Sequence, residues 1–362
     1  MDAVHAVQNR HARRGVVYAL AAAVLFGAST PGAKALLVGI SPVLMAGLLY
    51  LGSGVGLGLW SLLRTAAGKP RSEARLARRD LPCLAAVVLM GGMVGPALLM
   101  WGLARTPAST SALLLNLEGA LTAALAWFVF RENFDRRIAL GMLAIVAGGV
   151  LLSWGRTPEP GVPWGILAVA GACGAWALDN NLTRKIATAD PLQIAAIKGL
   201  AAGTTNVALA LGTGAAWPHS STVVLASGLG LVGYGLSLVL FILGLRHLGS
   251  ARSGAYFSCA PFVGAALALP LLRERPTVSF GAAAALMGLG LWLHLTEKHG
   301  HRHVHAPVTH EHRHEHDEHH QHEHAPGATV AGPHAHPHEH EPLEHAHPHY
   351  PDIHHRHEHG DQ

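Results

Sequence analysis

The stretch GLARTPASTSALLLNLEGALTAALAWFVFRE, residues 102–132, occurs a second time in this chain in altered form. Shifted by 142 positions without a gap, it aligns with GLRHLGSARSGAYFSCAPFVGAALALPLLRE at residues 244–274. Nine of the 31 aligned positions are identical, against roughly three expected by chance in a composition so rich in Ala and Leu. Each copy ends in Arg-Glu, and another apolar run then opens near Gly141 or Gly281. The chain therefore contains an internal repeat of apolar units, which predicts a membrane protein.

The composition agrees with a membrane location. Half of the residues are hydrophobic and 13% are charged, and the charges gather in short clusters between long uncharged runs, as in polytopic helical membrane proteins. Cys83, Cys173 and Cys259 lie far apart within apolar runs. We interpret them as small hydrophobic residues in helix packing rather than as a disulfide or a thiolate metal site. The sequence offers no soluble domain to hold a catalytic set or a nucleotide loop, so we expect neither an enzyme nor a nucleic-acid partner.

The apolar runs predict an all-α protein with ten transmembrane helices. Each run is close to the roughly 20 residues that a helix needs to cross a bilayer. The abundant glycines, 42 in the chain, predict close helix approach through small-residue faces. The predicted spans are residues 16–36, 42–63, 82–104, 109–130, 137–155, 162–182, 191–213, 222–245, 252–272 and 277–296.

Lys and Arg residues in alternate connections predict the orientation. Sixteen of them fall on the side of the N-terminus and five on the other side. The positive-inside rule then places both termini in the cytoplasm. The five on the outer side are Lys34, Arg105, Arg156, Arg273 and Arg275. Because five spans per repeat is an odd number, the second repeat is inserted upside down relative to the first, an architecture typical of transporters.

These features resemble the EamA family of the drug/metabolite transporter superfamily. In each half a second helix opens on Ser41-Pro42 or Asp190-Pro191, and an Ala-rich fourth helix ends in Arg-Glu before a Gly-rich fifth. The family's fourth and ninth helices commonly carry a mid-span proline. The second half has Pro261 there, whereas the first half has Glu118-Gly119, so a helix break in the first half would depend on Gly119.

The resemblance implies four segments and a function. Residues 1–15 form a cytoplasmic N-terminus, 16–155 and 162–296 are two EamA repeats of five helices, and 299–362 form a cytoplasmic tail. The resemblance implies a secondary transporter of a bacterial-type inner (plasma) membrane. It would export a small organic metabolite, an amino acid or related compound, by proton-coupled alternating access with no required cofactor. A divalent-metal (Ni, Co or Zn) carrier or metal-tolerance protein, and a non-transporting metal sensor, remain as alternatives. The expected partners are the substrate and the lipid bilayer, and a homodimer is among the arrangements that the sequence allows.

Ionisable residues inside the predicted spans are the candidate transport pathway, because such groups are costly in hydrocarbon unless they face protein or water. Glu118 lies near the middle of the fourth span, two positions after Asn116. A carboxylate removed from water can exchange a proton near neutral pH, as a proton-coupled carrier requires. The alternative is a structural Glu satisfied by a helix dipole or a Lys.

Four further candidates for the transport pathway lie in the sixth and seventh spans. Asp179 and Asn180 close the sixth span, and Lys198 lies in the seventh, where it could pair with Asp179 or with Glu118. The sequence favours a functional role and a purely structural role of such an ion pair equally. Asn206 follows on the face of Lys198, and an intramembrane Asn more often joins helices than binds a substrate.

The tail has a different character. Residues 299–362 hold 23 of the 28 His residues, mostly as His-x-His interleaved with Glu, Asp and Pro. With no periodic apolar residue, we expect the segment to be disordered. Alternate side chains of an extended segment share one side, so imidazoles and carboxylates can bind Zn, Ni, Co or Cu. The candidate ligands are His299, His301, His303, His305, His310, His312, His314, His316, His319, His320, His322, His324, His334, His336, His338 and His340.

Metal binding by the tail is a separate matter from metal transport. No His lies deep within a predicted span, since His294 is in the last turn of the tenth and His219 and His247 lie in connections. A membrane path for a soft divalent ion would need such ligands. We therefore expect the tail to store, buffer or sense metal beside the carrier.

The tail should bind several divalent ions with an affinity that depends on pH. A bound imidazole must be neutral, and its unperturbed pKa is near 6.5. Affinity should therefore fall steeply as the pH drops from about 7 to about 5.5. Calorimetry on the isolated 299–362 peptide at both pH values measures this, with transport by the truncated carrier as the companion assay. One tight site that ignores pH would contradict the prediction, and transport abolished by truncation would favour a metal carrier.

Overall fold

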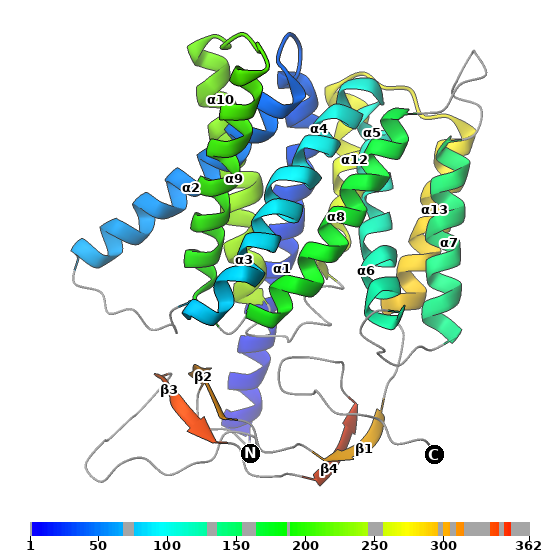
Figure 1. Cartoon of the computed structure of the whole chain (residues 1–362). Helices are drawn as coiled ribbons and strands as arrows, with labels where there is room; N and C mark the ends of the chain where they lie inside the picture. Colours follow the sequence, from blue (N-terminus) through cyan, green and yellow to red (C-terminus); the bar gives the residue numbers. More distant parts are fainter. Residues whose placement is uncertain are drawn as a thin grey trace.

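The fold is a bundle of long helices with short strands beyond one end, seen in a computed structural model (Figure 1). The structure describes residues 2–67, 76–128, 136–153, 164–186, 189–244, 256–295, 300–304, 309–314, 334–339 and 344–348.

The ten predicted spans are confirmed as helical segments. The first half contains α1 (Asp2–Leu36), α2 (Pro42–Ala66), a third segment made of η1 (Arg78–Asp80), α3 (Leu81–Val87), η2 (Val88–Val94) and α4 (Gly95–Arg105), a fourth made of α5 (Ala108–Leu114) and α6 (Asn116–Phe128), and α7 (Arg136–Ser153). The second half contains α8 (Trp164–Ile186), α9 (Pro191–Gly212), an eighth segment made of α10 (Ser220–Gly230) and η3 (Leu231–Leu236) that continues helically to residue 244, α12 (Ala260–Leu271) and α13 (Val278–Leu295). Within the described residues, five of these segments are long and apolar enough to cross a membrane by length and composition alone.

Proline and a capping carboxylate fix where the second helix of each half begins. Pro42 and Pro191 occupy the first turn, where a missing N–H costs nothing and the fixed φ suits a helix. The Asp190 carboxylate accepts a hydrogen bond from the Leu192 N–H at 2.9 Å. The residues that mark the repeat in the sequence are thus the residues that start its helices.

Helices of the two halves pack against each other. α2 packs on its equivalent α9 and α7 on its equivalent α13, while the contacts of α1 with α12 and of α6 with α8 correspond to each other under the repeat. Glycines face each other at the α2–α9 crossing. A Cβ on Gly199 would lie 2.6 Å from the Gly54 Cα, and one on Gly203 would overlap the Leu51 backbone. The small-residue packing expected from the glycine content therefore occurs between the two repeats.

Helix irregularities recur at equivalent positions. η2 is π-helical, and a shift of 142 residues carries its range 88–94 onto 230–236, where η3 is also π-helical over Leu231–Leu236. The fourth segment breaks at Leu115, and the ninth has a turn at residues 258–259, one to two residues beyond the equivalent position. Paired interruptions of this kind mark the binding region in inverted-repeat carriers.

The first-half break comes one turn earlier than Gly119 would place it. Gly119 lies inside α6, whereas the Asn116 amide donates to the Leu113 carbonyl at 2.9 Å. A short polar side chain that bonds a nearby carbonyl competes with the helical ladder. Asn116, not Gly119, therefore accompanies the break.

Two charged side chains bond helix ends: Glu274 joins the second repeat to the first, and Lys34 joins two helices of the first repeat. Glu274, just after α12, accepts hydrogen bonds from the N–H groups of Ala108 (2.7 Å) and Ser109 (3.0 Å) and from the Ser109 hydroxyl (2.5 Å). Lys34 of α1 donates to the carbonyls of Leu103 (2.5 Å) and Thr106 (3.1 Å). A carboxylate at the start of α5 and an ammonium at the end of α4 both complement the helix dipoles.

The described residues of the tail form four short strands, and most of the segment predicted to be disordered lies outside the described residues. β1 (Gly300–Val304) pairs antiparallel with β4 (Glu344–Pro348), and β2 (Thr309–His314) pairs with β3 (His334–Glu339). The His-x-His alternation has the two-residue period of a strand. The strands and the start of α1 lie beyond the same end of the bundle (Figure 1), as an even number of spans requires.

Enlarging Gly199 should weaken the α2–α9 crossing. We expect Gly199→Leu to destabilise the protein by at least about 1–3 kcal/mol, the usual cost of overpacking, because the contacted atoms are backbone. Gly58→Leu on α2 is the matched control, since a Cβ at Gly58 meets nothing within 4 Å. Thermal unfolding in detergent measures both variants, and equal melting temperatures would refute the proposed packing role.

Candidate functional site

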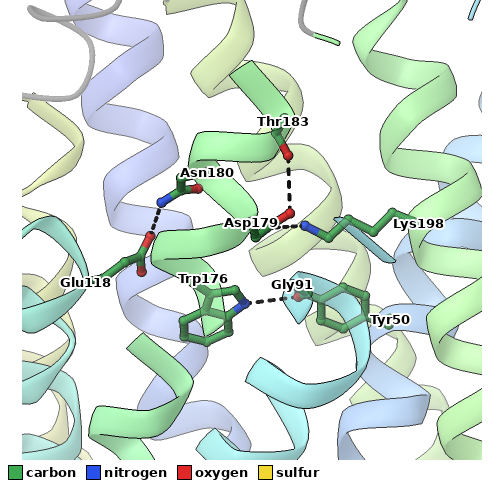
Figure 2. A network of polar contacts seen from close by, with 8 residues as sticks. All are labelled: Tyr50, Gly91, Glu118, Trp176, Asp179, Asn180, Thr183 and Lys198. Carbon is green, nitrogen blue, oxygen red and sulfur yellow. Dashed lines mark hydrogen bonds and ion pairs between the residues drawn. The ribbon is translucent and has the colours of Figure 1, made fainter. Parts of the chain in front are cut away.

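A cavity of about 160 Å³ lies among helices of both repeats, lined from α1, α2, α6, α8, α9 and η3 and by residues near 241 and 257. Its polar lining residues are Glu118, Asp179, Asn180, Lys198, Ser53 and Ser237, together with the amphipathic Tyr50 and Tyr234. Figure 2 shows the two carboxylates approaching from α6 and α8, with Trp176 beside them. Four of the six predicted pathway residues therefore line one cavity: Glu118, Asp179, Asn180 and Lys198.

Asp179 and Lys198 form a buried ion pair. The Lys198 Nζ donates to one Asp179 carboxylate oxygen at 2.5 Å, and the Thr183 hydroxyl donates to the other at 3.2 Å. Only 7% of the Asp179 side chain and 14% of the Lys198 side chain are exposed. Of the two partners that the sequence allowed for Lys198, the structure selects Asp179. Each charge compensates the other's loss of hydration.

Glu118 lies in a different electrostatic setting. It occupies the first turn of α6, just after the break, where the positive end of a helix dipole favours a carboxylate. The Asn180 amide donates to Glu118 Oε1 at 2.8 Å. In the part of the chain that the structure describes, no Lys, Arg or His lies within ion-pair distance of Glu118. The carboxylate is thus hydrogen-bonded but has no countercharge of its own.

The remaining wall is aromatic. Phe26 is its centre, with ring centroids 5.6 Å from Tyr234, 5.5 Å from Phe257 and 6.5 Å from Trp176. Tyr50 extends the wall with its centroid 5.4 Å from Tyr234.

The π-helical segment η2 holds two of these rings. The Tyr50 hydroxyl and the Trp176 indole N–H both donate to the Gly91 carbonyl, at 2.7 and 3.0 Å (Figure 2). A Cβ on Gly91 would overlap the Asp179 carboxylate. A larger residue at this position would therefore displace the Asp179 carboxylate from its place beside Lys198.

The two remaining pathway candidates lie outside the cavity lining. Asn116 is buried at the helix break, bonded to Leu113. Asn206 is also buried, and its amide donates to the Gly92 carbonyl at 3.3 Å, which joins α9 to η2. Both satisfy backbone carbonyls that irregular helices leave open.

The aromatic lining was missed from the sequence. Its residues lie within apolar runs, where hydropathy does not separate a ring that faces a cavity from one that faces lipid. A usable signal was the repeat itself, because Gly91 and Gly233 are 142 residues apart and Gly233 precedes Tyr234.

The predicted metal ligands are not tested by the structure. His301, His303, His310, His312, His314, His334, His336 and His338 lie in the strands, where only the backbone is described. Outside the described residues lie His299, His305, His316, His319, His320, His322, His324 and His340. Over the ranges that the structure describes, no group of three or more His, Cys, Asp or Glu residues could hold a metal ion.

A cavity between two inverted repeats of membrane helices defines a membrane transport protein. Residues 13–154 and 163–296 match the model of the EamA-like transporter family. The chain therefore belongs to the EamA-like transporter family, and the resemblance noted from the sequence is confirmed.

Two individual proteins are also similar. An uncharacterized transporter of Methanothermobacter thermautotrophicus is 26% identical over 287 residues, which cover 75% of this chain and 83% of that protein. A solved crystal structure of a protein superposes with a TM-score of 0.59 at 20% identity, over 77% of this chain and 94% of that one. The second similarity concerns the fold alone.

Removing Lys198 should expose the cost of burying Asp179 alone. We expect Lys198→Met to destabilise the protein by about 3–5 kcal/mol, the usual penalty for an orphaned buried charge. The double variant Asp179→Asn, Lys198→Met should regain most of that loss. Thermal unfolding and folded yield measure both, with Arg64→Met at the exposed end of α2 as control. A double variant no more stable than Lys198→Met would contradict a structural ion pair.

Proposed function

We propose that this protein is a secondary carrier that exports a small organic metabolite, an amino acid or related compound, by proton-coupled alternating access. The cavity is the observation on which this proposal depends. It lies between the two repeats, beside the breaks and π-helical segments, and both repeats contribute to its lining. Rocking of one repeat against the other would expose it to either side of the membrane in turn.

Glu118 would carry the coupling proton. Asn180 is suited to both protonation states, because its amide group donates to the ionised carboxylate and its carbonyl oxygen can accept from the protonated one. Asp179 is the less suitable carrier, since its charge is committed to Lys198. One carboxylate then exchanges a proton while the neighbouring pair holds α8 against α9.

The proposed orientation follows from the distribution of Lys and Arg. Both termini would face the cytoplasm of a bacterial-type inner membrane. The tail would then bind its divalent metals beside the inner opening without supplying the transported substrate. The described lining of the cavity contains neither His nor Cys, so it is poorly suited to a soft divalent ion.

Glu118→Gln should abolish or uncouple transport while the protein stays folded. Gln keeps the size and hydrogen-bonding capacity of Glu but cannot titrate. Export from reconstituted vesicles under an imposed pH gradient should lose its gradient dependence. Asp190→Asn is the matched control, because Asn caps a helix as well as Asp does and Asp190 lies outside the cavity lining. Transport with unchanged pH dependence in Glu118→Gln would make Glu118 structural.

A further inference from the structure

We propose that the cavity recognises an organic ammonium ion with an apolar body, and that it favours amines over neutral, anionic or zwitterionic compounds. The inference rests on the proposed function of the cavity as the substrate site. It narrows the substrate class from amino acids and related compounds to the related amines that lack a carboxylate. It depends on three observations: the unbalanced charge of the lining, the aromatic wall, and the fixed hydrogen bonds of that wall.

The charge of the lining favours a cation. Three charged side chains are described around the cavity, and Asp179 and Lys198 neutralise each other at 2.5 Å. Glu118 is left with an amide as its hydrogen-bond partner. With all three groups ionised, the lining carries one net negative charge. A monovalent cation balances it, whereas an anion would have to displace Asp179 from Lys198.

The aromatic wall adds a surface that suits the same cation. The chain has only 8 Trp, 5 Tyr and 8 Phe residues, yet six of them gather here: Phe26, Tyr50, Trp176, Tyr234, Phe241 and Phe257. Ring faces carry negative partial charge and attract ammonium groups, which is how aromatic cages hold choline-like ligands. The two carboxylates and the ring faces thus all present negative charge or negative partial charge.

The hydrogen bonds of two rings prevent them from acting as donors to a substrate. The Tyr50 hydroxyl and the Trp176 indole N–H both point to the Gly91 carbonyl. These groups would otherwise be the natural partners of a substrate carboxylate. Tyr50 and Trp176 therefore contribute their rings to the lining, with these two donors already bonded. An amino acid would therefore bring a carboxylate for which the described lining offers one cation, Lys198, already held by Asp179, and otherwise only neutral donors such as the hydroxyl groups of Ser53 and Tyr234.

The size of the cavity limits the apolar body. An apolar cavity of about 150 Å³ accommodates benzene, and this cavity measures about 160 Å³. A single ring or a short branched chain attached to the ammonium group would fill it. The expected substrates are thus small amines rather than large hydrophobic cations.

The charge preference can be measured with one series of ligands that share a phenyl ring. The full-length protein in lipid nanodiscs is titrated by calorimetry with 2-phenylethylammonium, its N,N,N-trimethyl derivative, 2-phenylethanol, 3-phenylpropionate and phenylalanine. The two cations should bind at least ten times more tightly than the alcohol and the propionate, with phenylalanine weaker than the amine. The trimethyl compound has no proton to donate, so its binding reports charge and ring contact alone.

Two variants test whether Glu118 and Phe26 produce the preference for cations. Glu118→Gln should weaken both cations at least tenfold and change the binding of 2-phenylethanol less than twofold, while Asp190→Asn changes neither. Phe26→Leu should weaken the cations severalfold, whereas Phe280→Leu, a buried ring on α13 outside the cavity lining, should not.

Three outcomes would overturn the proposal: equal or tighter binding of the alcohol or the propionate, a cation preference that survives Glu118→Gln, or no binding of any of the five compounds. Other outcomes separate this proposal from the proposed function. Cation binding without export from vesicles would contradict the carrier function but support the cation site. Proton-coupled export of a compound without an ammonium group would support the carrier function but contradict the cation site.

Discussion

Every backbone polar group inside a bilayer must find a partner within the protein, because hydrocarbon offers none. Long regular helices meet this requirement, but this fold interrupts its helices near its centre. The carbonyls at the interruptions are bonded by side chains: Gly91 by Tyr50 and Trp176, Gly92 by Asn206, and Leu113 by Asn116. These donors allow irregular backbone to lie at membrane depth, and the cavity lies where they gather.

The repeat is symmetric in backbone and asymmetric in charge. The π-helical segments and the helix breaks recur at a spacing close to 142 residues, but Glu118 is equivalent to Ala260 under that shift. The carboxylate comes from the first half, and the Asp179–Lys198 pair from the first two helices of the second. Duplication supplies the paired backbone frame of the two halves, and the substitutions within each copy supply the charged groups of the cavity.

The spans were predictable because a bilayer imposes a length and an apolar composition that can be counted along the chain. The same logic identified Glu118 and Lys198 as expensive residues in need of partners. Hydropathy could not predict the aromatic wall. Trp176 is 6% exposed and lines the cavity, whereas Trp292 is 57% exposed on the outer surface of α13, yet both lie in similar apolar runs.

The position of the break at Leu115 was not predicted, because no proline marks it. Asn116, which accompanies the break, acts through a hydrogen bond to the nearby Leu113 carbonyl. The tail alternates His with other residues. Its two-residue period is compatible with a strand, and its polar composition is compatible with a disordered segment.

The bonds that Glu274 makes to Ala108 and Ser109 stabilise one closed end of the bundle. They join the end of α12 to the start of α5, so any motion that separates these helices must break them. Hydrogen bonds to a charged group contribute about 1.5–3 kcal/mol each to stability. A ligand shifts a conformational equilibrium only by the difference in its affinity for the two states. These bonds belong to the arrangement in which this end is closed, and a compound that opened it would have to bind the opened form more tightly by an amount of that order.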